Sequence, residues 1–484
     1  MAVFARRAIH SVEMKSRIRR GIEISPSLSG FFHDVMEGRT YMARNYTLTE
    51  GHIAGTLARF AVPVCLTLCL QALYGGADLL VVGQFASTAD VSGVATGSML
   101  LSTVTMIITG LSLGITILVG RHIGRKKPRQ AGDIVGGGIV VFALFGIVLT
   151  VLLAGGAELF AALLDAPAEA LSQTVQYIRI CGAGSLCIVA YNVLGAIFRG
   201  IGDSITPLIT VAVACAINIA GDLLLVAVFD MGAAGAALAT VTAQTVSIVL
   251  ALLMIRNRAL PFILTRRSFS SSFRVAGAIV KLGVPVALQE LLVGTSFLVI
   301  QMLVNSIGIV ASAGVGVAEK VCVFLMLVPS AYMQSMAAFT AQNMGAGLME
   351  RAQKGLSCGI LTAFSAGCFM SYLSFFHGDA LSAVFSADEA VIAASYEYLK
   401  AYAVDCLLTP FLFCFMGYYN GCGRTVFVMV QGIVGALLVR IPVVYAISCL
   451  DGATLFQIGL GTPASSTVQI ILCLLMFQYL RKRN

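Results

Sequence analysis

Charged side chains are scarce in this chain of 484 residues. Asp, Glu, Lys and Arg together make up 11% of it, where globular proteins carry roughly 25%. Hydrophobic residues account for 58%, and the mean hydropathy is +0.93. So few charges cannot cover a surface that faces water, and most of the surface must therefore face lipid. The scarcity of charge excludes the soluble domains that the length alone would suggest.

Several signatures of other protein classes are missing as well. The chain has no P-loop, so we expect no use of ATP. It has no HExxH zinc motif and no TVGYG-type filter, so neither an intramembrane metalloenzyme nor a channel of that type is indicated. The 13 cysteines contain no CxxC pair, which argues against a disulfide framework or a metal site. We therefore expect a protein that is not an enzyme and has no cofactor.

The main feature that the sequence does contain is a series of long apolar runs. A helix needs about 20 apolar residues to cross a bilayer. Twelve runs meet this length, at 56–84, 92–120, 133–160, 171–198, 205–229, 233–255, 277–306, 311–341, 354–376, 391–419, 425–449 and 454–480. Because the runs are continuous and not alternating, a β-barrel is excluded. The predicted fold class is an all-α membrane protein with twelve transmembrane helices.

After the first 50 residues, most of the basic residues sit in short loops between these runs and not on one face of a soluble domain. Lys and Arg follow the second, sixth, eighth, tenth and twelfth runs, whereas the opposite loops carry acids and neither Lys nor Arg. This pattern argues against nucleic acid as a partner. By the positive-inside rule, both termini and the loop at 256–275 are expected in the cytoplasm, with the protein in the plasma membrane. We expect a monomer.

The first 50 residues lie outside the pattern of apolar runs. They are basic and lack a long apolar core, so they do not form a signal peptide. Two interpretations stay open. The segment is either a cytoplasmic tail close to anionic lipid or an over-extended start, with the natural chain beginning at Met42.

The two halves of the chain repeat each other. Several residues of the first half recur in the second half, in the corresponding run. Four pairs are 221 residues apart: Gly124 and Gly345, Tyr177 and Tyr398, Gly200 and Gly421, and Gly202 and Gly423. Pro63 and Pro285 are 222 residues apart. Six runs per half give both halves the same orientation, which is a known plan of transporters with the substrate path between the halves. We predict an N-lobe at 51–255, a cytoplasmic linker at 256–275 and a C-lobe at 276–484.

Four polar side chains of the N-lobe are expected at one depth. Asp78 lies late in the first run, Asn218 and Asp222 share one face late in the fifth, and Thr240 lies early in the sixth. Neither Lys nor Arg occurs in these runs near that depth. Ionised groups in a bilayer are costly, and two carboxylates without a cation need either bound Na⁺, with Asp78 and Asp222 as ligands, or a proton. The pattern predicts a site for a coupling ion.

The C-lobe carries charges of both signs. Glu290, Glu319, Lys320, Asp405 and Arg440 lie in or beside its runs, and three acids with two bases are able to neutralise one another. We treat them as a candidate polar or substrate path.

The sequence resembles the MATE (multidrug and toxic compound extrusion) family. The resemblance covers about 47–484 and is carried by LTEGHI, ALYGGADLLVVGQF, FRGIGDSITPL, NIAGDLLLV, GAAGAALATVTAQ and QNMGAG. It implies a two-lobed antiporter that expels organic cations and other drugs against inward H⁺ or Na⁺. It also implies a cation site on Asp78, Asn218, Asp222 and Thr240. Some members carry acids in the seventh and tenth helices, but Glu290 and Asp405 stand at shifted spacings.

Two further expectations follow from this interpretation. Pro63 lies inside the first run and frees a backbone carbonyl, so it is a candidate hinge whose bending would squeeze the N-lobe cavity. The alternative function is a flippase for lipid-linked oligosaccharides, which would share the two-lobed plan. A flippase would favour a cationic cavity for pyrophosphate, whereas the predicted N-lobe site is anionic.

Overall fold

The computed structural model describes residues 47–256, 260–270, 272–450 and 452–483, and these residues form helices and connecting turns. The helices in chain order are α3 (Ile53–Phe85), α4 (Thr88–Gly124), α5 (Pro128–Gly155), α6 (Ala157–Leu163), η1 (Ala168–Ala170), α7 (Leu171–Ala183), α8 (Ser185–Ile201), α9 (Ile205–Asp222), η2 (Leu223–Val228), α10 (Gly232–Arg256), α11 (Arg266–Ser270), α12 (Ser272–Asn305), α13 (Ile309–Leu325), α14 (Leu327–Gly345), α15 (Met349–Phe376), α16 (Gly378–Ala383), α17 (Glu389–Gly421), α18 (Thr425–Ile433), η3 (Val434–Arg440), α19 (Ile441–Ser448), α20 (Leu455–Gly459) and α21 (Gly461–Arg483). The tail at 1–46, with Met42, lies outside the described residues.

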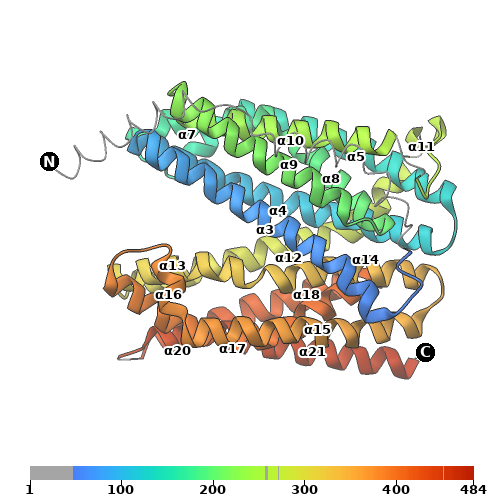
Figure 1. The fold of residues 1–484 in the computed structure, drawn as a ribbon. Coiled ribbons are helices and arrows are strands. Elements are labelled where there is room, and N and C mark those ends of the chain that lie inside the picture. The colour runs from blue at the N-terminus through green and yellow to red at the C-terminus, as the bar shows by residue number, and fades with distance from the viewer. Residues whose placement is uncertain (1–46, 257–259, 271, 451, 484) are drawn as a thin grey trace, which may run out of the picture.

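The predicted spans correspond to these helices. Ten of the described helical segments are long and apolar enough to cross a membrane, and two bent pairs raise the number to twelve. Most of the α3–α10 segment forms one lobe and most of the α12–α21 segment forms the other, with the two lobes side by side (Figure 1). The all-α class, the membrane spans and the two-lobed repeat are confirmed.

Two predicted spans are broken helices and not straight ones. The span predicted at 171–198 is α7 and α8, which meet at a bend of 53°, and the span predicted at 311–341 is α13 and α14, which meet at 42°. Pro329 lies in the first turn of α14 and lacks the N–H that would continue the ladder from α13. At Gly184, between α7 and α8, an added Cβ would lie 2.5 Å from the side chain of Val241, so the helix breaks where α10 approaches closely.

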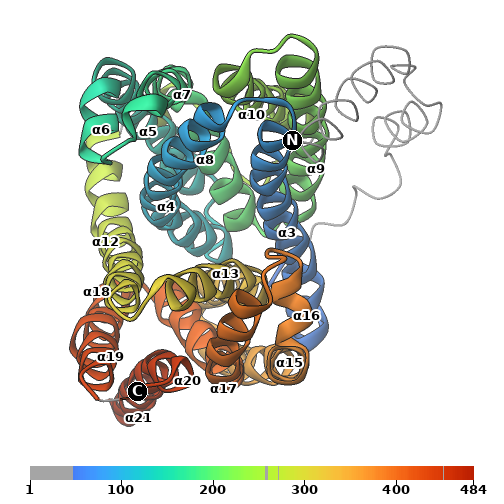
Figure 2. The same ribbon diagram turned by 90° about the vertical axis from the view of Figure 1, so that its left-hand side faces the viewer.

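The first helix of each half is shared between the lobes. Leu57 and Phe60 at the start of α3 belong to a core cluster of the C-lobe, whereas Val82 near its end belongs to an N-lobe cluster. In α12 the order is reversed, since Ile279 packs in the N-lobe and Ile300 in the C-lobe. Figure 2 shows α3 and α12 on opposite sides of the molecule, each running from one lobe to the other. The exchange of helices ties the two lobes together.

The lobes touch through matched contacts at the end of the molecule where the chain also enters α3 and leaves α21. We name it the basic end because the loop at 125–127 lies there. Arg121 Nη2 donates to the Gly421 carbonyl at 3.2 Å, and Gln342 Nε2 donates to the Gly200 carbonyl at 2.9 Å. Arg121 and Gln342 stand 221 residues apart in the repeat, as do Gly200 and Gly421. The repeat read from the sequence is therefore a two-fold arrangement of contacts in space.

Glycines permit this close approach. Gly124 lies against the Gln342 carbonyl oxygen, and Gly345 lies against the Arg121 carbonyl oxygen, the equivalent contact of the other lobe. A side chain at either position would meet backbone atoms that have little freedom to move. These glycines allow α4 and α14 to cross with their backbones in contact.

Candidate functional site

The four N-lobe residues predicted to form a cation site come together inside the lobe. Asp78 on α3, Asn218 and Asp222 on α9, and Thr240 on α10 are all buried, with exposed fractions of 5%, 1%, 0% and 9%. Thr240 Oγ1 donates to Asp78 Oδ2 at 3.0 Å, and Asn218 Nδ2 donates to Thr240 Oγ1 at 3.3 Å. Asp222 is close enough to Asp78 for the two carboxyl groups to interact electrostatically. Three helices thus supply one polar cluster.

The cluster has more acceptors than donors. Asp78 Oδ1, both carboxylate oxygens of Asp222 and Asn218 Oδ1 are buried without a hydrogen-bond partner among the described residues. No described Lys or Arg forms an ion pair with either carboxylate. Buried acceptors of this kind are costly unless something satisfies them. An oxygen-seeking cation such as Na⁺, or a proton shared between the carboxylates, fits this set of oxygen atoms.

The local backbone places the α9 pair. Asn218 and Asp222 are one turn apart, so they project from the same face of α9. Directly after Asp222 the helix widens into the π-helix η2, in which Phe229 N bonds to the Leu224 carbonyl at 3.0 Å. Segments of π-helix inside α-helices are frequently found at functional sites. Here the widening begins at the residue that brings the second carboxylate.

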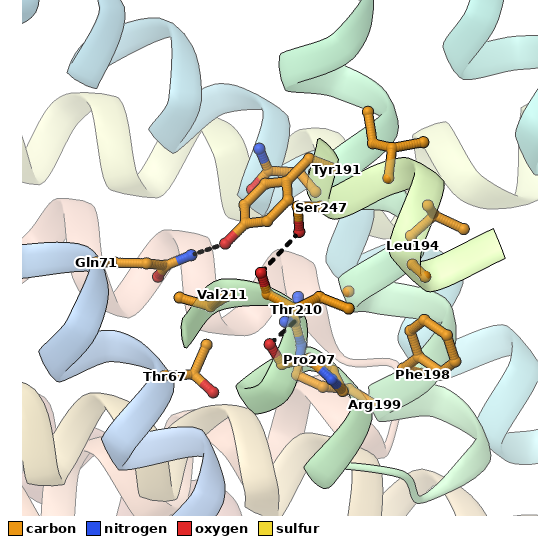
Figure 3. A pocket seen from close by; sticks show the side chains of 14 residues that line it. Thr67, Gln71, Tyr191, Leu194, Phe198, Arg199, Pro207, Thr210, Val211 and Ser247 are labelled. Carbon is orange, nitrogen blue, oxygen red and sulfur yellow. Dashed lines mark hydrogen bonds between the residues drawn. The ribbon is translucent and has the colours of Figure 1, made fainter. Parts of the chain in front are cut away.

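A small cavity opens beside the cluster and is lined in part by Asn218 and Thr240. Tyr191 lines both this cavity and a second, larger one on the side of the basic end. Tyr191 also accepts a hydrogen bond from Gln71 Nε2 at 2.8 Å. Figure 3 shows this hydrogen bond between the Gln71 and Tyr191 side chains, which both line the second cavity.

Sequence reasoning missed these cavity residues, although one signal was present. Gln71, Tyr74 and Asp78 are spaced at i, i+3 and i+7, so they share one face of α3. Tyr74 lines the smaller cavity and Gln71 the larger one. The polar face of α3 therefore continues from the carboxylate cluster toward the basic end. On α10, Thr240, Gln244 and Ser247 are spaced at i, i+4 and i+7, so the same signal was present for Ser247. No such spacing singles out Tyr191 on α8.

The five candidate residues of the C-lobe do not form one cluster. Arg440 is buried, donates from Nη1 to Ser296 Oγ at 2.9 Å and lies 4.3 Å above the Phe297 ring. Asp405 is buried near Ser466, and its Oδ1 has no hydrogen-bond partner among the described residues. Arg440 and Asp405 interact at longer range than an ion pair. The centre of the C-lobe thus contains its own cation, unlike the N-lobe cluster.

The remaining C-lobe residues lie apart from this pair. Lys320 is exposed, whereas Glu319, its neighbour on α13, is half-buried with Oε1 unpartnered among the described residues. Successive residues of a helix point about 100° apart, so these two charges do not neutralise each other directly. Glu290 on α12 is half-buried.

Two tandem bundles that share their first helices, with a buried carboxylate cluster in one of them, define a polytopic membrane transporter. The MatE family profile matches residues 63–224 and 285–446, two segments of equal length that begin 222 residues apart and cover more than half of the chain. The chain therefore belongs to the MatE family of multidrug efflux transporters.

Individual relatives agree with this assignment. The chain is 26% identical over 422 residues to the probable multidrug resistance protein YpnP of Bacillus subtilis (strain 168), covering 86% of this chain and 92% of that protein. It is 21% identical to the multidrug export protein MepA of Staphylococcus saprophyticus, covering 84% and 90%. A solved multidrug resistance MATE family transporter in an outward-facing conformation superposes with a TM-score of 0.85 at 19% identity, over 90% of this chain and 98% of that one.

Proposed function

We propose that this transporter is a secondary antiporter of the plasma membrane that exports organic, mostly cationic compounds in exchange for H⁺ or Na⁺. The observation that carries the proposal is the N-lobe cluster, in which Asp78 and Asp222 stand together with no described Lys or Arg to neutralise them. Two adjacent carboxylates in a medium of low dielectric repel each other, so an ion or proton stabilises the pair. The same two groups attract a cationic substrate, so ion and substrate compete for one site.

Both termini and the basic end are assigned to the cytoplasm in this proposal, since Lys and Arg concentrate there. The contacts of Arg121 and Gln342 close the basic end. In this proposal, the N-lobe cluster is therefore accessible from the side opposite the cytoplasm in the described state. Substrate release and ion binding take place in this state. The ion-loaded protein then returns to a state that opens toward the cytoplasm, and ion release there readies the cluster for the next substrate.

Transport by the purified full chain in liposomes tests this proposal. We expect ethidium to be exchanged for H⁺ or for Na⁺ when a gradient of that ion is imposed across the liposome membrane. Only one of the two gradients should drive this transport. Protein-free liposomes provide the control for leakage. No movement under either gradient would overturn the antiporter, and translocation of a fluorescent lipid in the same liposomes would then support the flippase alternative.

Pro63→Ala is expected to preserve ethidium binding and to lower turnover. Pro63 leaves the backbone of α3 without one hydrogen bond, and its own carbonyl accepts from Thr67 Oγ1 at 2.8 Å. Alanine restores the missing N–H and stiffens the helix that is shared by both lobes. Equilibrium binding and transport rate are measured on the same preparation, and turnover equal to the wild type would contradict a hinge at this position.

A further inference from the structure

The short helix α11 and the residues before it lie against the first turns of α5, in the N-lobe at the basic end of the molecule (Figure 1). Ile263 N donates to the Pro128 carbonyl at 3.1 Å, and Ser268 Oγ donates to Asp133 Oδ1 at 2.8 Å. Pro128 is the first residue of α5 and directly follows the turn that ends α4. Two segments that are far apart in the chain are therefore held side by side.

Six cations lie on these two segments. Four occupy exposed positions around the start of α5 and two are exposed on α11: Arg125, Lys126, Lys127, Arg129, Arg266 and Arg267. Among the described residues, no acid forms an ion pair with any of the six. Asp133 is the only Asp or Glu in 121–140 and 260–270, and it already accepts a hydrogen bond from Ser268. The positive charge of this surface is therefore not neutralised by neighbouring side chains.

Apolar side chains are exposed beside the cations. Ile263, Leu264 and Phe269 have exposed fractions of 47%, 41% and 40%. At a bilayer surface, such side chains enter the boundary between headgroups and acyl chains, and long Lys and Arg side chains keep their charges in the polar layer. Clusters of about four to eight Lys or Arg next to a transmembrane helix are typical of anionic-lipid recognition. We name the six cations and these three apolar residues the linker patch.

The repeat allows a comparison with the C-lobe. The segment that corresponds to 125–129 is 346–350, whose sequence AGLME contains neither Lys nor Arg. Just beyond it, Lys354 pairs with Glu350 at 2.7 Å, and Arg351 donates to two backbone carbonyls that precede α3. A general need for positive charge on one side of the membrane would be met by either lobe. The difference between the two loops therefore indicates a specific role for the loop of the N-lobe.

We propose that the linker patch binds the headgroups of anionic phospholipids in the cytoplasmic leaflet, with the cations on the phosphates and the apolar side chains in the bilayer beside them. The proposal goes beyond the export function and uses its assignment of the basic end to the cytoplasm. A soluble anion would satisfy the cations but would leave the three apolar side chains in water. A lipid surface satisfies both parts of the patch.

Tryptophan fluorescence tests this proposal, because the chain contains no Trp of its own. Leu264→Trp places a reporter in the linker patch, and Leu348→Trp places one at a position of nearly equal exposure in the equivalent loop of the C-lobe. Each full-length variant is reconstituted in vesicles of phosphatidylcholine with phosphatidylglycerol as the minor lipid. Two preparations have the same composition and differ only in which lipid carries a brominated acyl chain, which quenches a neighbouring indole.

We expect phosphatidylglycerol to be enriched around the reporter of Leu264→Trp on the order of 5-fold over its bulk fraction, the effect of about one cation at a charged surface. Around the reporter of Leu348→Trp, the bulk fraction is expected. High salt should lower the enrichment, since it screens exposed charges.

Three double variants, each in the Leu264→Trp background, separate the linker patch from charge elsewhere at the basic end: Arg266→Gln/Arg267→Gln on α11, Lys127→Gln/Arg129→Gln at the start of α5, and Arg481→Gln/Lys482→Gln at the exposed end of α21. The first two should each lower the enrichment several-fold, because both segments contribute to one surface. The third removes the same charge from the other lobe and is the matched control, in which the enrichment should not change.

Equal enrichment at both reporters would overturn the proposal, because the lipid preference would then belong to the whole basic end. Absence of enrichment at Leu264→Trp would also count against it. If neither brominated lipid quenches that reporter, the segment lies away from the bilayer and faces a partner in water, such as an acidic protein. Lipid enrichment in a protein that does not transport ethidium would refute the antiporter and leave the lipid site intact.

Discussion

Asp78→Asn is expected to reduce gradient-driven export strongly, while the protein still folds and Asp222 still attracts a cationic substrate. Asn has the size of Asp and keeps an acceptor for the Thr240 hydroxyl, which donates to Asp78 at 3.0 Å. It has no charge, so Asp222 is the one carboxylate left in the cluster to bind H⁺ or Na⁺, and the repulsion that favours ion binding is lost. We expect the coupled rate to fall by roughly 5–150-fold, the range for coupling free energies of about 1–3 kcal/mol. Ethidium flux in liposomes with and without the gradient measures the loss.

Substrate exchange at equal concentrations on both sides separates uncoupling from misfolding. Asp78→Asn should retain this exchange, since no ion needs to move in it. Asp405→Asn is the matched control in the C-lobe, where Arg440 already supplies a cation, and it should retain most of the coupled export. Coupled export that survives in Asp78→Asn and disappears in Asp405→Asn would place the coupling site in the C-lobe.

Gly124→Ala is expected to break the contact between the lobes at the basic end. The new Cβ would overlap the Gln342 carbonyl oxygen and lie 2.9 Å from its carbon, and backbone atoms cannot rotate away. Overpacking of this kind costs about 1–3 kcal/mol. The closed conformation of the basic end should lose stability by that amount. This corresponds to a shift of roughly 5–150-fold in the equilibrium between the closed and open conformations of the basic end. Hydrogen–deuterium exchange of the segments around Arg121 and Gln342 is expected to rise.

Gly345→Ala tests the equivalent contact of the other lobe, because Gly345 lies against the Arg121 carbonyl oxygen. It should reproduce the effect of Gly124→Ala. Gly277→Ala serves as the control, since an added Cβ there meets no atom within 4 Å. If all three variants exchange hydrogen at the wild-type rate, the glycine contacts do not hold the basic end closed.

The fold was predictable from the sequence to a large extent. Length and apolar composition define twelve spans because each helix in lipid must satisfy its own backbone, so the information is local. The recurrence of residues such as Gly124 and Gly345 predicts the repeat. The breaks between α7 and α8 and between α13 and α14 were missed, because hydropathy alone does not distinguish a bent span from a straight one.

Predictability of the candidate site differs between the lobes. Asp78, Asn218, Asp222 and Thr240 were predicted to share one depth, and the structure brings them together. The reasoning succeeded because depth along a straight helix follows from residue number. In the C-lobe, counting charges did not predict that Lys320 is exposed or that Arg440 bonds to Ser296, since facing direction and helix neighbours decide both.

The sequence by itself determined the class of protein, the number of spans and the polar residues that enter the membrane, because lipid imposes a strict rule on each segment separately. Only the tertiary structure decided which segments meet. It divides α3 and α12 between the lobes, places Arg121 and Gln342 on carbonyls of the opposite lobe, and leaves Arg199 facing a cavity. These contacts join residues far apart in the chain, and they depend on close packing of whole helices, which no local pattern of residues encodes.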